Sequence, residues 1–179
     1  FNNLLCQGMV LKDGAVMSKS RGNVIDPRVI VEKFGADTAR TFVLFMAAPE
    51  KELEWSDQGV EGIYRFLKRV QALVEKPSDY RKKANNKDLH LLSKTHSTIK
   101  KATQLVEEFK FNAAINSVME LVNLMTKYSE SGGHKETYAE ALRSLTLLIA
   151  PITPHLAEEM WETQGNKGFV STANWPEYE

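Results

Sequence analysis

The chain has 179 residues, 42% hydrophobic and 26% charged, with a formal net charge of zero, a composition that excludes a disordered protein. Its longest apolar runs, such as residues 145–150, are far shorter than the ~20 residues of a membrane-spanning helix. Its N-terminus lacks a basic segment followed by an apolar core, the pattern that predicts a signal peptide. The single cysteine, Cys6, excludes an internal disulfide and a cysteine-based zinc site, so we expect a cytoplasmic protein with no membrane partner.

The first elements predict a β-hairpin followed by a loop. Extended runs at residues 4–11 and 15–16 flank Lys12-Asp13-Gly14, and Asp-Gly between such runs favours a tight turn. The loop over residues 17–24 comes next.

Two short helices are expected after this loop. Asp26 can cap the first, with Pro27 at its first helical position and Gly35 at its end. Asp37 is predicted to cap the second, which covers residues 38–46 and ends before the next proline.

From Ser56 onward the sequence predicts amphipathic helices. Ser56 and Asp88 are the expected caps of the first two, and residues 76–87 the exposed connector between them. Five apolar stripes recur at helical spacing: Val60, Ile63, Leu67, Val70 and Val74; Leu89, Leu92, Ile99, Ala102, Val106 and Phe109; Phe111, Ala114, Val118, Leu121, Met125 and Tyr128; Tyr138, Leu142, Leu145 and Ile149; and Leu156, Met160 and Trp161. We therefore predict a mainly α protein, in which a small α+β piece over residues 1–53 precedes a helical bundle over residues 54–179.

The charges are unevenly distributed along the chain. Residues 1–64 carry a balance of −2, residues 65–110 a balance of +7, and residues 111–179 a balance of −5. The basic middle either forms an electropositive face suited to a phosphate backbone or is a well-solvated helical surface. The charge count alone leaves both interpretations open.

The serine–lysine loop (Met17, Ser18, Lys19 and Ser20) carries the clearest chemical signal. Two hydroxyl residues flank one lysine, and a Gly-Asn pair at residues 22–23 allows a tight turn. Such a loop can place an ammonium group and backbone N–H groups around a polyphosphate.

The loop matches the last four positions of the five-residue lysine signature of class I aminoacyl-tRNA synthetases, and its surroundings resemble the leucyl-tRNA synthetases. The segments that carry the resemblance are residues 8–14, 22–27, 35–40, 53–56, 59–62 and 65–70. Residues 150–161 and 174–176 are similar to the end of the anticodon-binding-type helical domain of that family.

The resemblance implies ATP-dependent activation of leucine and its transfer to tRNA(Leu) by a monomeric enzyme. Lys19 would then be the catalytic residue at the ATP phosphates, with Met17, Ser18 and Ser20 forming the nucleotide-binding loop around it. Mg²⁺ would enter with ATP, and this chain itself would bind no metal. One position departs from the pattern, because Val16 stands where the family has its first lysine. This departure bears on the closure of the loop more than on the assignment to the family.

We expect this chain to be part of a longer enzyme and inactive alone. It does not begin with Met and contains no His-x-Gly-His-like run, a signature that the family's nucleotide-binding fold requires. The resemblance also implies an editing insert and a small C-terminal tRNA-contacting domain, and we expect neither within this chain.

The expected tRNA-docking surface lies in the basic middle of the chain. Spacings of three and four residues place Arg65, Lys68 and Arg69 on one helical face. Arg81, Lys82, Lys83 and Lys87, in the connector, would extend this face.

Two alternatives remain open from the sequence. One is a non-catalytic helical module that binds tRNA, other RNA or protein and keeps a relic of the loop, an interpretation that Val16 alone favours. The other is a valyl-, isoleucyl- or methionyl-type synthetase, which would change only the amino acid.

Overall fold

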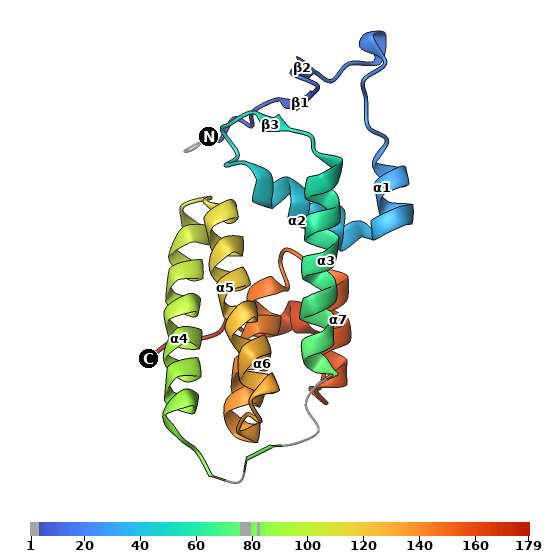
Figure 1. Cartoon of the computed structure of the whole chain (residues 1–179). Helices are drawn as coiled ribbons and strands as arrows, with labels where there is room; N and C mark the ends of the chain where they lie inside the picture. The colour runs from blue at the N-terminus through green and yellow to red at the C-terminus, as the bar shows by residue number, and fades with distance from the viewer. Residues whose placement is uncertain (1–3, 76–79, 82) are drawn as a thin grey trace.

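The computed structural model describes residues 4–75, 80–81 and 83–179, and most of these residues are helical (Figure 1). The α-helices are α1 (Pro27–Phe34), α2 (Ala36–Met46), α3 (Asp57–Val74), α4 (Asn86–Glu107), α5 (Phe111–Glu130), α6 (Lys135–Ile149) and α7 (Pro154–Thr163). The remaining elements are the strands β1 (Val10–Lys12), β2 (Ala15–Val16) and β3 (Leu53–Glu54) and the 3₁₀ turns η1 (Lys19–Arg21) and η2 (Val170–Thr172). The predicted fold class, a mainly α protein with a small α+β piece at its start, is confirmed.

A three-stranded sheet of order β2-β1-β3 forms the N-terminal edge of the molecule. Strands β1 and β2 are the predicted hairpin, although its first strand is shorter than the apolar run suggested. Asp13 and Gly14 both have positive φ, 54° and 71°, as a two-residue hairpin turn requires. Strand β3 pairs in parallel with β1 and was not predicted, because it has only two residues and its partner lies more than forty positions upstream.

Helix α1 begins as predicted, whereas the prediction for α2 is wrong in one respect. The Asp26 carboxylate accepts a hydrogen bond from the Arg28 amide at 2.9 Å. Helix α2, however, has Gly35 as its N-cap, and Asp37 lies inside its first turn and is buried. The Asp37 carboxylate instead accepts a hydrogen bond at the start of α7, from the amide of Leu156. A carboxylate can serve any helix N-terminus that it reaches, and here the tertiary fold selects a distant one.

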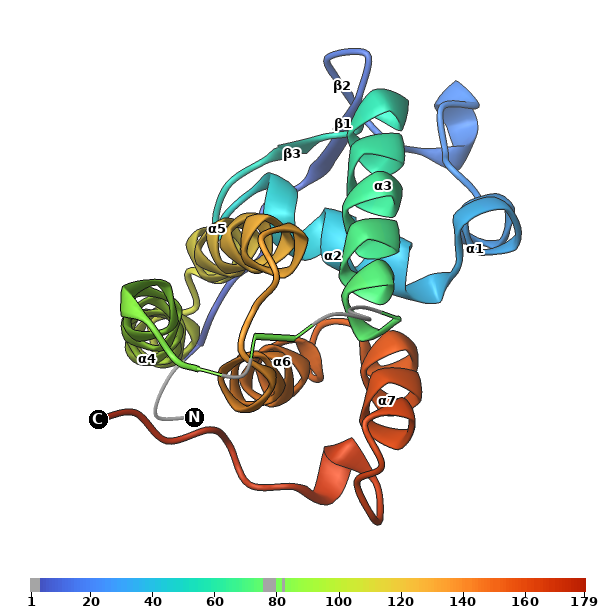
Figure 2. The same ribbon diagram turned by 60° about the horizontal axis from the view of Figure 1, so that its bottom comes forward.

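The buried apolar side chains form one hydrophobic core. Figures 1 and 2 show how the helices that supply these side chains are arranged. Helix α4 packs on α5 and α6, α3 packs on α5 and α7, and α2 contacts α3, α5 and α7 from the N-terminal side. The predicted stripes supply most of this core, and they are joined by Phe42, Phe66, Leu73, Leu91, Leu148 and Ala157. The end-on view of Figure 2 shows α6 between α4, α5 and α7.

The predicted stripe from Leu89 to Phe109 differs from the structure at both ends, and Phe109 lies beyond the end of α4. Leu89 and Phe109, expected in the core, are 67% and 50% exposed. The buried face uses Thr95 and Thr98 instead, whose hydroxyls donate to the carbonyls four residues earlier at 2.9 and 2.7 Å. A threonine that bonds its own helix leaves no unsatisfied group, so it can be buried without the cost of an unpaired hydroxyl.

The cap of α4 is Asn85, and the prediction of Asp88 is wrong by one turn. The Asn85 side chain accepts from the Lys87 amide at 2.8 Å. Asp88 lies at the third helical position, where its carboxylate accepts from the Asn85 backbone, and the two residues form a capping box.

Candidate nucleotide loop and nucleic-acid face

The serine–lysine loop leaves strand β2 and closes into the single turn η1. The Met17 amide donates to the Val10 carbonyl at 3.2 Å, which ties the start of the loop to β1. Gly22 ends the turn in the left-handed conformation, with φ of 67°, which favours glycine at this position. The Lys19 side chain is exposed, and among the described residues no carboxylate is paired with it. Its ammonium is therefore available to an anionic ligand.

Asn23 holds the loop in shape, a role that the sequence did not reveal. Its Oδ1 accepts from the Ser18 amide at 2.9 Å, and its Nδ2 donates to the carbonyl of Val16 at 3.3 Å and of Ala15 at 3.5 Å. The hydroxyls of Ser18 and Ser20 lie 3.2 Å apart. The Gly-Asn pair marked a turn, but only the folded loop shows which backbone groups the amide contacts.

The three predicted cations of α3 are all exposed and share one side of the helix. Lys68 Nζ donates to Gln71 Oε1 at 3.2 Å, and Arg69 Nη1 donates to Asn123 Oδ1, on α5, at 2.8 Å. These partners are neutral, and none of Arg65, Lys68 and Arg69 is paired with a carboxylate in the part of the chain that the structure describes. We call these three residues the α3 basic face.

Arg81 is held in a polar cluster at the end of the bundle. Its Nη2 lies 2.6 Å from Asp88 Oδ1, and its Nε donates to the Gly132 carbonyl at 2.6 Å. Lys83 is exposed, Lys87 lies in the first turn of α4, and Lys82 lies outside the described residues. Arg81 thus differs from the three cations of the α3 basic face, because its charge is already matched by a carboxylate.

Asp88 is the centre of this cluster, which we call the Asp88 cluster (Arg81, Asp88 and Tyr128). The Tyr128 hydroxyl donates to the Asp88 carboxylate and accepts from the His134 amide at 2.7 Å. Burial raises the pKa of the Asp88 carboxyl, but the hydrogen bonds that it accepts outweigh burial and lower its pKa to about 2. A side chain at Gly133 would overlap the Tyr128 ring, so this close approach requires glycine.

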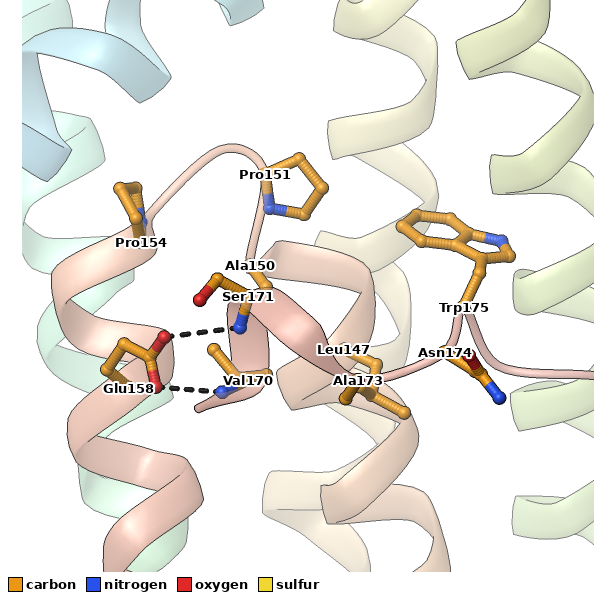
Figure 3. A pocket seen from close by; sticks show the side chains of 10 residues that line it. All are labelled: Leu147, Ala150, Pro151, Pro154, Glu158, Val170, Ser171, Ala173, Asn174 and Trp175. Atoms are coloured by element: carbon orange, nitrogen blue, oxygen red, sulfur yellow. Dashed lines mark hydrogen bonds between the residues drawn. The ribbon is translucent and has the colours of Figure 1, made fainter. Parts of the chain in front are cut away.

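A pocket of about 300 Å³ lies between the α6–α7 turn and the C-terminal segment (Figure 3). Its one charged lining residue, Glu158, accepts from the amides of Val170 and Ser171 at 2.8 and 3.2 Å. Burial raises the pKa of Glu158, but these two backbone bonds outweigh it and lower the pKa. Trp175, across the pocket, donates to Thr103 Oγ1 at 2.7 Å and anchors the segment on α4. The hydrogen bonds that the structure shows in this pocket thus serve the fold.

The described residues hold neither a metal-binding cluster nor a membrane span. Residues 4–75, 80–81 and 83–179 contain no group of three or more His, Cys, Asp or Glu side chains placed to hold a metal ion. In the same part of the chain, every helix is too short or too polar to cross a membrane.

Family models match both parts of the chain. The model for the anticodon-binding domain of tRNA ligases matches residues 88–179, which is more than half of the sequence, and the model for class I tRNA synthetases (I, L, M and V) matches residues 1–56. The chain belongs to the tRNA ligase family.

Within this tRNA ligase family, the sequence is similar to leucine–tRNA ligases over its full length. It is 46% identical to the enzyme of Thermotoga maritima and 48% identical to that of Geobacter sp. strain M21, with 100% of this chain covered. The chain spans 23% of the length of each of these relatives. The resemblance to leucyl-tRNA synthetases is thereby confirmed.

Solved structures of this family have the same fold. The leucyl-tRNA synthetase of Agrobacterium radiobacter K84, in a ternary complex with tRNA and LeuAMS, matches 96% of this chain and 23% of its own length, with a TM-score of 0.83 and 33% identity. The Mycobacterium tuberculosis methionyl-tRNA synthetase, in complex with methionyl-adenylate, matches 90% of this chain and 38% of its own length, with a TM-score of 0.69 and 20% identity. This second likeness supports the fold alone.

Proposed function

We propose that the chain is the part of a leucine–tRNA ligase that supplies the ATP-phosphate loop and a tRNA-docking helical domain. Residues 1–53 would be the end of the catalytic domain and residues 54–179 the anticodon-binding-type bundle. The observation that carries the proposal is the serine–lysine loop, whose shape is held by the Asn23 side chain. The loop exposes Lys19 to solvent, and Lys19 has no carboxylate partner among the described residues.

In the proposed reaction, a leucine carboxylate oxygen attacks the α-phosphorus of ATP. The bond from the α-phosphorus to the bridging oxygen breaks, and pyrophosphate leaves with the negative charge. A terminal ribose hydroxyl of the tRNA then attacks the leucyl carbonyl, and AMP leaves. Lys19 and the loop amides would stabilise the charge that grows on the pyrophosphate, and Mg²⁺ would enter bound to the ATP phosphates.

The amino acid and the activity can be tested together. The full-length protein should exchange labelled pyrophosphate into ATP when leucine is present, and much more slowly when isoleucine, valine or methionine replaces it. A preference for one of those three amino acids would reassign the substrate. Exchange with none of the four would favour the non-catalytic binding module.

We further propose that the α3 basic face docks on the tRNA backbone. Three neighbouring cations, with no acidic partner among the described residues, attract phosphates and make no base-specific contact. The affinity for tRNA would therefore depend on salt and little on sequence. Lys82, Lys83 and Lys87 could extend the contact. Arg81 would act mainly by holding the connector to Asp88, because its guanidinium already has a carboxylate partner.

Reversing the α3 basic face should weaken tRNA binding. With Arg65→Glu, Lys68→Glu and Arg69→Glu combined, the log–log salt slope of the binding constant should flatten by about 0.9 for each duplex phosphate that the protein no longer neutralises. Filter binding across a salt series measures both quantities, and leucine-dependent exchange should stay unchanged. Lys51→Glu, Lys135→Glu and Lys167→Glu, three exposed positions outside α3, give the same change in net charge and serve as the control. Equally weakened binding in both triple variants would show that the α3 basic face has no special role.

A further inference from the structure

Helix α2 carries two charged side chains that reach the turn between α6 and α7. Asp37 Oδ2 accepts from the Leu156 amide at 2.7 Å, and Asp37 Oδ1 lies 2.9 Å from His155 Nδ1. Arg40 donates from Nε to the Ile152 carbonyl at 3.1 Å and from Nη2 to the Pro151 carbonyl at 2.9 Å. We call these two residues, Asp37 and Arg40, the α2 clasp.

The α2 clasp satisfies opposite ends of two helices at once. The first amides of a helix lack partners and favour an anion, whereas carbonyls at a helix C-terminus favour a cation. Asp37 meets the start of α7, and Arg40 meets the two residues just after Ala150, where α6 has ended. Each of these hydrogen bonds joins residues more than 110 positions apart. Together they fix the α6–α7 turn against α2.

Helix α2 connects the serine–lysine loop, through α1, to the helices of the bundle. It follows α1, which follows the serine–lysine loop, and it packs against α1, α3, α5 and α7. Its two clasp residues are three positions apart and therefore share one face. The hydroxyls of Thr38 and Thr41 donate to carbonyls four residues earlier, at 2.7 Å each, so neither competes for the α6–α7 turn.

The loop itself is fixed by a separate set of contacts. Asn23 and the β1–β2 hairpin hold it, whereas the side-chain hydrogen bonds described for Asp37 and Arg40 all go to residues 151–156. A change at Asp37 or Arg40 should thus move the bundle relative to the loop while the loop keeps its own shape.

We propose that Asp37 and Arg40 are positioning residues that set the bundle against the catalytic piece for transfer to tRNA. This inference rests on the proposed function. Adenylate formation would take place in the complete catalytic domain, of which residues 1–53 are the proposed end, whereas transfer needs the tRNA to contact the bundle and reach the adenylate at the same time. The α2 clasp would therefore matter for the second step and not for the first.

The test compares the two steps in the full-length enzyme. Asp37→Ala and Arg40→Ala should each lower kcat/KM for aminoacylation about tenfold, mainly through a higher KM for tRNA. This change lies within the ~5–150-fold range that is typical of coupling between two sites. Leucine-dependent pyrophosphate exchange should stay within about twofold of wild type, since no coupling is broken in that step. Arg28→Ala, an exposed arginine on α1, is the matched control and should change neither activity.

Conservative variants separate positioning from a failure to fold. Asp37→Asn keeps an acceptor for the Leu156 amide and should restore most of the aminoacylation that Asp37→Ala removes. Arg40→Lys keeps the charge but not the two-nitrogen fork that reaches both carbonyls, so it should restore only part.

The outcomes distinguish this inference from the proposed function. If exchange and aminoacylation fall together with the melting temperature, or if neither changes, the α2 clasp has no positioning role and the inference is overturned. If the wild-type enzyme shows no leucine-dependent exchange, the proposed function fails instead.

Discussion

Replacing Lys19 with alanine should slow leucine-dependent pyrophosphate exchange about 10²–10³-fold in the full-length enzyme, with little change in leucine binding. The ammonium is needed mainly as charge develops on the leaving pyrophosphate, so its removal should lower kcat and leave the ground-state complex almost intact. Steady-state exchange kinetics, together with equilibrium dialysis of leucine, measure the two quantities separately.

Two further variants make the Lys19 result specific. Lys19→Arg keeps a cation on the loop and should retain more activity than Lys19→Ala. Lys33→Ala, an exposed lysine on α1, should leave exchange unchanged. An exchange rate in Lys19→Ala equal to that of wild type would remove this lysine from the mechanism.

Asp88→Ala should lower the free energy of unfolding by about 3 kcal/mol, near the lower end of the cost of breaking a buried charged pair. The lower end is expected because Arg81 keeps 25% of its side chain exposed and can be partly rehydrated. The variant also removes the acceptor of the Tyr128 hydroxyl and one half of the α4 capping box. Urea unfolding followed by circular dichroism measures the change.

The neighbouring Lys94–Glu120 pair provides a matched control for Asp88→Ala. It also joins α4 to α5, at 2.6 Å, but its side chains are 31% and 57% exposed. Exposed pairs contribute about 0–1 kcal/mol, so Glu120→Ala should cost much less than Asp88→Ala. Equal costs would contradict the importance of burial at Asp88.

The Asp88 contribution should also depend on pH in a defined direction. Its folded pKa of about 2 lies below the ordinary value of 3.8, so the stabilisation is complete above that ordinary value. It disappears as the pH falls toward 2 and the folded carboxylate takes up its proton. The difference in unfolding free energy between wild type and Asp88→Ala should therefore narrow as the pH falls from about 4 to about 2.

The features that depend on neighbours within a few positions could be predicted from the amino-acid sequence. The Asp13-Gly14 turn, the Asp26 and Ser56 caps and the spacing of the apolar stripes all arise from local sterics, local hydrogen bonds and helical periodicity. The serine–lysine loop was also recognisable, because its chemistry is carried by consecutive residues.

The partners of the buried and half-buried charged groups, in contrast, became known only from the folded chain. Asp37 was predicted to cap its own helix, yet it caps α7. The pairing of Arg81 with Asp88 was not predicted, and the role of Arg81 in tRNA docking stays a prediction. A carboxylate or guanidinium is satisfied by any suitable group within about 3 Å, and no spacing in the sequence states which distant backbone the packing of the core will bring there.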